Sequence, residues 1–244
     1  MFMKANRTAM VTGGSRGIGK AIAAQLASMG YNLLIVAKDA SRMKQTAKEL
    51  AQQYGSKVEF FQCDISKTKE IDSLHDFCMS KGITPNILVN NAGIYHPGSS
   101  EGTIEKYDSM MAINSRGVFY LTQKLLPLIK KTKNGRIIII SSTWALDSYN
   151  AEGKEDGTVY AISKWALRGW ARSLRSELRK YGIGVTIIYP GAVITDEWEG
   201  TELPHESFIQ PEDIGKIVGT IVSTNDQTVI EEVTVRPLSG EMHE

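Results

Sequence analysis

A tyrosine and a lysine stand four positions apart in the segment Tyr160-Ala-Ile-Ser-Lys164. On a helix this spacing places the phenol and the ammonium group on one face, about one turn apart. The free phenol has a pKa near ~10, and a nearby cation favours the phenolate, so the proton leaves more easily. The pair could therefore serve as a general acid in the reduction of a carbonyl group.

The spacing alone is not specific, because the chain repeats it at Tyr120 and Lys124. Context separates the two pairs. Tyr160 follows a buried strand that ends at Ser142, and ligands of open α/β sheets bind beyond the carboxyl ends of the strands. Tyr120 lies in the middle of a helical segment. We therefore expect chemistry at Tyr160 and Lys164, and a structural role for Tyr120 and Lys124.

A glycine-rich turn spans Thr12 to Gly19 and reads T-G-G-S-R-G-I-G. Glycines let the backbone approach a pyrophosphate, and a helix start offers free N–H groups and the positive end of its dipole. The glycine order differs from G-x-G-x-x-G, and such a turn can also be a plain corner between a strand and a helix. Its place after the first strand favours a dinucleotide site. The residues expected to line this site are Gly13, Ser15, Arg16, Gly17, Ile18 and Gly19.

The end of the second strand indicates which dinucleotide is bound. Proteins that bind NAD usually carry an acid there for the ribose 2′-hydroxyl, but Ala37 takes that position here. Lys38 and Arg16 instead supply two cations, which suit the 2′-phosphate of NADP because a carboxylate would repel it. Asp39 would come closer if the strand ended one residue later, and both cations could simply be solvated. We predict NADP(H) as the cofactor.

The elements that must position these groups alternate strand and helix along the chain. We expect strands near residues 8–12, 31–37, 58–63, 86–89, 136–140, 185–189 and 229–235, with helices between them. A helical pattern over 104–129 should break near Asn114. The predicted fold class is α/β: a Rossmann-like, doubly wound parallel sheet of six to seven strands with helices on both faces. Residues 1–244 should form a single domain.

Composition narrows the choice of function. Of the 244 residues, 42% are hydrophobic, which excludes a disordered chain, and 28 basic residues nearly balance 27 acidic ones. The balance gives no reason to expect a nucleic-acid partner or an anionic membrane. The two cysteines and four histidines show no disulfide framework and no metal-ligand spacing. No stretch has the length of a signal peptide or a membrane span. We expect a cytoplasmic protein with no metal site.

In their order and spacing, the motifs resemble those of the short-chain dehydrogenase/reductase family, along nearly the whole chain. The resemblance is carried by the glycine turn, Asp64, N-N-A-G from Asn90 to Gly93, Asn114, I-S-S ending at Ser142, Tyr160-x-x-x-Lys164, and P-G-A-V-I-T from Pro190 to Thr195.

The resemblance implies roles for these positions. Tyr160 would be the acid/base, Lys164 would hold the nicotinamide ribose and assist Tyr160, and Ser142 would orient the substrate carbonyl. Asn114 would support a water-linked proton path to Lys164. Asp64 would meet the adenine. The further cofactor-binding residues would be Lys38, Ile65, Asn91, Ala92, Gly93, Tyr160, Lys164, Pro190, Gly191, Val193 and Thr195.

Two segments depart from the family pattern. Ser142 and Tyr160 are eighteen positions apart, which is more than the resemblance leads us to expect, and the surplus lies in residues 147–157. Residues 195–211 are rich in acids and contain Trp198 and Phe208, which could close on a substrate as a lid. A solvated acidic loop with Trp198 packed inward fits the sequence equally well.

The leading hypothesis is therefore an NADPH-dependent oxidoreductase that reduces a ketone or aldehyde by hydride transfer, with Tyr160 as general acid. The nearest named activity is 3-oxoacyl-[acyl-carrier-protein] reductase, although the acidic loop would repel an acidic carrier. The alternatives are a general carbonyl or alcohol dehydrogenase for another small substrate, and a dinucleotide sensor without turnover. By family analogy we expect a homodimer or homotetramer.

Overall fold

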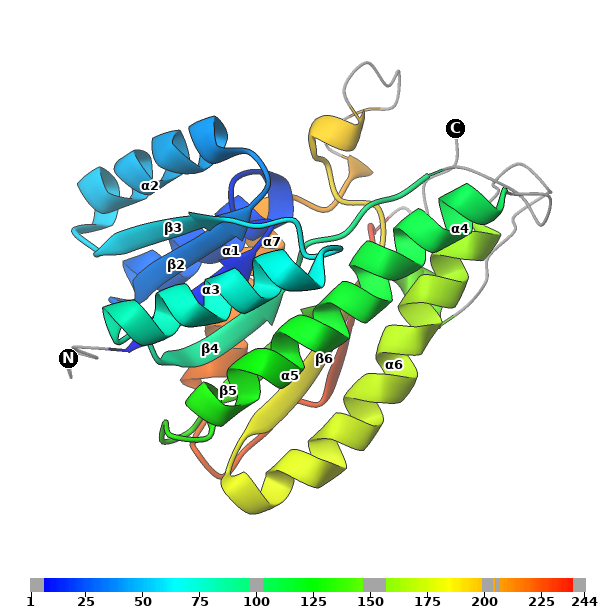
Figure 1. Cartoon of the computed structure of the whole chain (residues 1–244). Helices are drawn as coiled ribbons and strands as arrows, with labels where there is room; N and C mark the ends of the chain where they lie inside the picture. The colour runs from blue at the N-terminus through cyan, green and yellow to red at the C-terminus, as the bar shows by residue number, and fades with distance from the viewer. Residues whose placement is uncertain (1–6, 97–102, 147–156, 199–203, 205–206, 239–244) are drawn as a thin grey trace.

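The computed structural model describes residues 7–96, 103–146, 157–198, 204 and 207–238. They form a seven-stranded, wholly parallel sheet in the order β3-β2-β1-β4-β5-β6-β7 (Figure 1). The strands are β1 (Thr8–Thr12), β2 (Asn32–Ala37), β3 (Val58–Gln62), β4 (Pro85–Asn90), β5 (Arg136–Ile140), β6 (Gly184–Pro190) and β7 (Glu232–Val235). The predicted fold class is confirmed.

Helices fill the connections between the strands. The α-helices are α1 (Gly17–Ser28), α2 (Ala40–Tyr54), α3 (Thr68–Lys81), α4 (Ile104–Met110), α5 (Val118–Ile129), α6 (Thr158–Leu178) and α7 (Pro211–Ser223). A π-helix, η1 (Met111–Gly117), joins α4 to α5, so the predicted break around Asn114 is a change of helix type. The short 3₁₀ turns are η2 (Thr143–Ala145), η3 (Arg179–Tyr181) and η4 (Asp196–Trp198).

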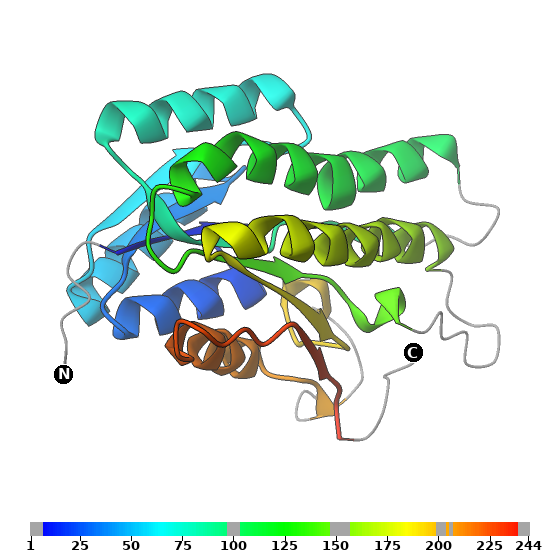
Figure 2. The same cartoon turned by 90° about the horizontal axis from the view of Figure 1, so that it is seen from below.

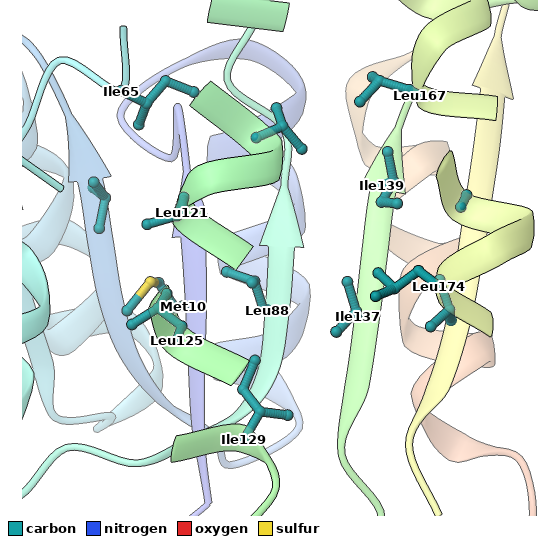
Figure 3. Packing of buried hydrophobic residues seen from close by; sticks show 14 of the residues in the cluster. Met10, Ile65, Leu88, Leu121, Leu125, Ile129, Ile137, Ile139, Leu167 and Leu174 are labelled. Carbon is teal, nitrogen blue, oxygen red and sulfur yellow. The ribbon is translucent and has the colours of Figure 1, made fainter. Parts of the chain in front are cut away.

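The sheet separates two layers of helices, which Figure 2 shows on opposite sides of the strands. Successive strand residues alternate between the layers because strand side chains point to opposite faces. Met10 packs toward α3, α5 and α6, whereas Val11 packs toward α1, α2 and α7. Figure 3 shows Leu121 and Leu125 of α5 beside Met10 and Leu88. Strands buried on both faces explain the apolar run of β5.

The last strand is shorter than predicted, because β7 begins at Glu232 and not at residue 229. Side chains donate hydrogen bonds to the backbone carbonyl groups just before this strand. Thr186 Oγ1 donates to the Ile230 carbonyl at 2.6 Å, and an Arg175 nitrogen donates to that of Glu231 at 2.8 Å. These side-chain bonds tie the segment to the sheet edge where a strand was expected.

The strand order predicts a binding crevice at one place. The chain runs outward from β1 through β2 to β3, then returns and runs the other way from β4 to β7. β1 and β4 are therefore neighbours whose following connections leave toward opposite faces, and ligands of open α/β sheets bind beyond the carboxyl ends of such strands. The glycine turn follows β1, and Asn91 to Gly93 follow β4.

None of the described helices is long and apolar enough to cross a membrane. The cytoplasmic location stays a prediction.

Candidate active site

The glycine turn is folded tightly at the carboxyl end of β1. Gly13 has a φ of 64°, in the left-handed region that glycine tolerates best, and its N–H donates to the Val36 carbonyl at 2.7 Å. A Cβ on Gly19 would collide with the Gly13 carbonyl oxygen. The two glycines thus allow α1 to start directly against the turn.

The start of α1 fits a negatively charged group. Its N-cap, Arg16, makes no side-chain capping bond, and the first turn of α1 contains no acid. The first N–H groups of a helix lack intrahelical partners and carry the positive end of the dipole. This end of α1 therefore offers what a pyrophosphate requires.

Hydrogen bonds fix the segment after β4 against the turn. The Thr12 hydroxyl accepts from the N–H groups of Asn91 at 2.9 Å and Ala92 at 3.0 Å, and donates to the Val89 carbonyl at 3.2 Å. Asn91 Nδ2 donates to the Thr12 carbonyl at 2.9 Å. The Asn91–Gly93 segment is thereby brought beside the glycine turn, as the sequence led us to expect.

Three cations gather at the ends of β2 and α1, and each has an acidic partner. Arg16 and Arg42 each bond to Asp196 Oδ2, at 3.1 and 2.9 Å. Lys38 Nζ lies 3.7 Å from Asp64 Oδ2. Sequence reasoning missed Arg42, although its place in the first turn after β2 is a usable signal. That Arg16 and Lys38 bind the 2′-phosphate stays a prediction.

Two carboxylates in this region are held by local bonds. Asp39 caps α2 by accepting from the Arg42 N–H at 2.9 Å, so its side chain is engaged at the helix start. Burial alone would raise the pKa of Asp64, but hydrogen bonds from Ser66 and the charges of Lys38 and Lys67 outweigh it, and the pKa is lowered. Asp64 is therefore ionised at neutral pH.

The other predicted cofactor residues have different surroundings. Ile65 and Val193 are buried in the two hydrophobic clusters, and Ile18 packs against one of them. The Gly191 N–H donates to the Val235 carbonyl at 2.8 Å, which ties the end of β6 to β7. Thr195 comes close to the glycine turn, since a Cβ on Gly17 would lie 3.2 Å from its Cγ2. The loop after β6 therefore reaches across to α1.

The lysine of the Tyr160–Lys164 pair is buried at the carboxyl end of β5. Lys164 Nζ donates to the Ile140 carbonyl at 3.3 Å and lies 5.2 Å from the centroid of the Tyr160 ring. The Ser141 hydroxyl donates to the Lys164 carbonyl at 3.4 Å. The two groups lie close together on α6, as the spacing predicts; the burial of the lysine is an additional finding.

Asn114 is fully buried in η1 and fixed on three sides. Its Oδ1 accepts from the Ile94 N–H at 2.9 Å, and its Nδ2 donates to the Ile94 carbonyl at 2.9 Å and to Ser163 Oγ at 3.1 Å. A Cβ on Gly93 would lie 3.4 Å from Asn114 Oδ1 and 3.5 Å from Lys164 Nζ. Asn114 and Lys164 therefore approach one another across Gly93. Sequence reasoning missed Ser163, which lies within the Tyr160–Lys164 segment.

Ser142 and Tyr95 border the same region. Ser142 follows β5 and caps η2, with its hydroxyl accepting from the Trp144 N–H at 3.3 Å. The rings of Tyr95 and Tyr160 meet edge to face with centroids 5.2 Å apart. Tyr95 was not predicted, although it lies two positions after the end of the N-N-A-G segment.

The second tyrosine–lysine pair has a structural partner. The Tyr120 hydroxyl donates to Asp72 Oδ1 at 2.8 Å, and Lys124 Nζ lies 2.7 Å from the same atom. Both hold α5 against α3. This agrees with the structural role expected from the sequence.

Only parts of the two unusual segments are described. The insertion at 147–157 lies outside the described residues except for Gly157. In the loop after β6, backbone bonds between residues 192–194 and Ile209 anchor both ends. Phe208 is buried, and its ring centroid lies 4.7 Å from that of Trp198. The lid stays a prediction.

The fold and this arrangement define an oxidoreductase of the dinucleotide-binding α/β class, with a tyrosine, a lysine and a serine at the carboxyl ends of the strands. The family model for short chain dehydrogenases matches residues 7–203, and the chain belongs to that family.

Relatives and solved structures match along nearly the whole chain. An uncharacterised oxidoreductase of Staphylococcus saprophyticus is 31% identical, over 96% of this chain and 98% of its own. A metagenomic short-chain oxidoreductase solved with NADP is 30% identical, with a TM-score of 0.81 over 95% and 96% of the two chains. An alcohol dehydrogenase of Thermococcus sibiricus, complexed with 5-hydroxy-NADP, is 27% identical, with a TM-score of 0.85 over 98% and 99%.

Proposed function

We propose that this enzyme reduces a ketone or aldehyde to an alcohol with NADPH, and oxidises the alcohol in the reverse direction. The observation that carries the proposal is the buried Lys164 ammonium group, 5.2 Å from the Tyr160 ring, at the end of β5. The cofactor is supported by the open start of α1, by the cations around Asp196, and by the NADP compounds in the two solved structures.

Each residue has a distinct task in this reaction. Bound NADPH supplies a hydride to the carbonyl carbon. The Ser142 hydroxyl holds the carbonyl oxygen, and Tyr160 delivers the proton to that oxygen as general acid. Lys164 stabilises the phenolate that remains, because the two groups are close and the ammonium group is buried. Asn114, fixed by Ile94 and Ser163, keeps the approach to Lys164 open for a proton to return.

For the substrate we favour a small free carbonyl compound over a carrier-bound acyl group. Acidic residues are frequent in the sequence that follows β6, between Thr195 and Pro211. An acidic carrier protein would be repelled there. 3-Oxoacyl-[acyl-carrier-protein] reduction is the second candidate, and a panel of plain ketones and an acetoacetyl thioester separates the two by NADPH oxidation.

A sensor without turnover is disfavoured by the density of bonds around the catalytic groups. A site that only binds a dinucleotide has no need to fix Asn114 on three sides or to bury Lys164. The test compares Tyr160→Phe with Tyr120→Phe, which removes the same hydroxyl from the second tyrosine–lysine pair. We expect Tyr160→Phe to lower turnover by about 10²–10⁴-fold with NADPH binding nearly unchanged.

Tyr120→Phe should turn over like the parent, since its hydroxyl bonds to Asp72 at the far side of α5. Turnover is followed by NADPH absorbance, and cofactor binding by NADPH fluorescence. Undiminished turnover in Tyr160→Phe would contradict the assignment of Tyr160 as the general acid.

We also propose that the chain assembles as a homodimer or homotetramer through α5 and α6. The two helices lie side by side (Figure 1). Large apolar side chains lie exposed on them, with 46% exposure for Phe119 and 43% for Trp165. The ring of Phe119 also meets Trp170 of α6, at 5.8 Å between centroids. Sedimentation measurements of the parent and of Trp165→Glu test this surface.

A further inference from the structure

Asp196 joins three parts of the chain that are far apart in sequence. Arg16 stands at the end of the glycine turn, Arg42 lies in the first turn of α2, and Asp196 opens η4 after β6. Both guanidinium groups contact the same carboxylate oxygen, Oδ2, at 3.1 and 2.9 Å. One oxygen therefore lies between the two cations.

From this contact we propose that Asp196 is a resident counter-ion that the 2′-phosphate of the cofactor must displace, and that it thereby sets the selectivity for NADP(H) over NAD(H). The inference rests on the proposed function in one respect, namely that the phosphate is bound by Arg16 and Arg42. A phosphate offers several acceptor oxygens and more charge than a carboxylate, so it competes for the same guanidinium donors.

The exchange affects one cofactor and not the other. A cofactor with a free 2′-hydroxyl leaves the two ion pairs intact, whereas a 2′-phosphate must break or rearrange both. Asp196 therefore weakens the binding of the phosphorylated cofactor selectively. Its pKa is lowered mainly by the hydrogen bond from Arg16; partial burial opposes the shift, and the charges of Arg16 and Arg42 add to it. The carboxylate is thus charged at neutral pH.

The exposure of the three side chains makes the exchange feasible. They are 53%, 45% and 44% exposed for Arg16, Arg42 and Asp196. Ion pairs that face water are weak and their partners exchange readily. A fully buried triad would instead lock the arginines away from a ligand.

The experiment uses the full chain and two fragments that differ by one phosphate, adenosine 2′,5′-bisphosphate and 5′-AMP, with binding measured by calorimetry. Asp196→Asn keeps the shape of the side chain and removes its charge. We expect it to bind the bisphosphate about 3- to 10-fold more tightly, with little change for 5′-AMP. Weaker binding of the bisphosphate, no change, or an equal gain for both fragments would overturn the proposal.

The matched control is Glu49→Gln, which makes the same change in net charge at another ion pair between α1 and α2. Glu49 pairs with Lys20 at 2.7 Å and touches neither arginine. Its affinity for the bisphosphate should equal that of the parent; a gain as large as that of Asp196→Asn would mean that net charge alone is responsible.

A second set of variants tests the mechanism of the gain. In an Arg16→Ala, Arg42→Ala background, Asp196→Asn should give no gain, and a persisting gain contradicts the exchange. A failure of the proposed NADP(H) preference gives a different result from a failure of the counter-ion proposal. If the parent protein binds adenosine 2′,5′-bisphosphate and 5′-AMP equally, it has no 2′-phosphate site. Failure of carbonyl reduction leaves the fragment affinities as they are.

Discussion

At the scale of single residues, neighbours decide the role of a side chain more than spacing does. Tyr160 and Tyr120 each precede a lysine by four positions. Beside Tyr160, Lys164 is buried, and the rings of Tyr95 and Tyr160 meet edge to face. Around Tyr120 both partners bond to Asp72, and the pKa of Asp72 is lowered, first by the bond from Lys124 and then by that from Tyr120. We therefore expect the first pair, and not the second, to face a substrate.

The cations at the crevice give a prediction about cofactor choice. The Lys38→Ala, Arg16→Ala variant should lose affinity for NADPH by about tenfold or more, because hydrogen bonds between charged groups are the strong ones. Affinity for NADH should change by much less, since that cofactor has no 2′-phosphate. Fluorescence titration with the two reduced cofactors measures both values. Equal losses for NADPH and NADH would refute the placement of the phosphate at these cations.

The sequence located this end of the crevice but could not assign its partners. The sequence shows that Ala37 stands at the end of β2, where NAD-binding proteins usually have an acid, and that Lys38 follows it. That Asp39 caps α2 follows from backbone geometry, and that Asp196 reaches Arg16 depends on a contact across 180 positions of the chain. Such long-range pairs are set by how β6 and α1 pack, which no local pattern contains.

At the scale of elements, the π-helix η1 determines where Asn114 lies. π-Helices are rare and occur often at functional sites, because the extra residue per turn shifts the side chains that follow. Ser115 Oγ donates to the Ser163 carbonyl at 2.9 Å, so η1 is also tied to α6. The sequence predicted a break near Asn114 but could not predict its type, since contacts such as this one with α6 are not contained in the local pattern.

A glycine in η1 provides a prediction for the element. A Cβ on Gly117 would run into the Ile65 carbonyl oxygen and lie 2.9 Å from the Ala112 carbonyl oxygen. Gly117→Ala should therefore destabilise the protein by about 1–3 kcal/mol, a typical cost of an overpacked position, and should lower turnover by displacing Asn114. Urea unfolding and NADPH oxidation measure the two effects.

Gly169→Ala in α6 is the matched control. No atom lies within 4 Å of the added Cβ, and the residue is exposed in a helix interior. Alanine is the better helix former there, so the free energy of unfolding should rise by about 0.5–1 kcal/mol. Because Gly169 lies one helical turn from Trp165, on the surface proposed for assembly, the two variants are compared at equal oligomeric state, checked by sedimentation. If both alanine variants lose stability alike, the close approach of Gly117 to Ile65 is not the cause.

At the scale of the whole molecule, the sequence predicted the parallel sheet well because the signal is repeated. Each strand reads as a short apolar run and each connection as an amphipathic helix, so an error at one boundary, such as the start of β7, leaves the topology intact. The loops beyond the strand ends carry no such periodicity. We expect these loops to select the substrate, which therefore could not be predicted from the repeated pattern.

Groups buried in the core beside the sheet should make the stability of the protein depend on pH at high pH. Three buried groups have raised pKa values. The pKa of the Cys63 thiol rises from 9.0 to about 12, mainly because the thiol is buried and to a lesser extent because of the negative charges of Glu70 and Asp64. Burial raises the pKa of Cys78 from 9.0 to about 12, and burial followed by Glu232 raises that of Tyr189 from 10.0 to about 12. The folded state keeps these protons at pH values where the unfolded chain has released them.

The free energy of unfolding should therefore be constant with respect to these groups up to about pH 8 and fall as the pH rises through roughly 9 to 12. Each group contributes a slope of up to about 1.4 kcal/mol per pH unit in that range. Urea midpoints at pH 8, 9, 10 and 11 measure the fall. The Cys63→Ala, Cys78→Ala variant starts from a lower stability but should decline less steeply between pH 9 and 10, where the thiols of the unfolded chain, with an ordinary pKa of 9.0, are ionised to a greater extent than Tyr189, whose ordinary pKa is 10.0. A parent whose midpoint holds steady to pH 11, or a double variant with the parent's slope, contradicts the assignment of the alkaline transition to these buried thiols.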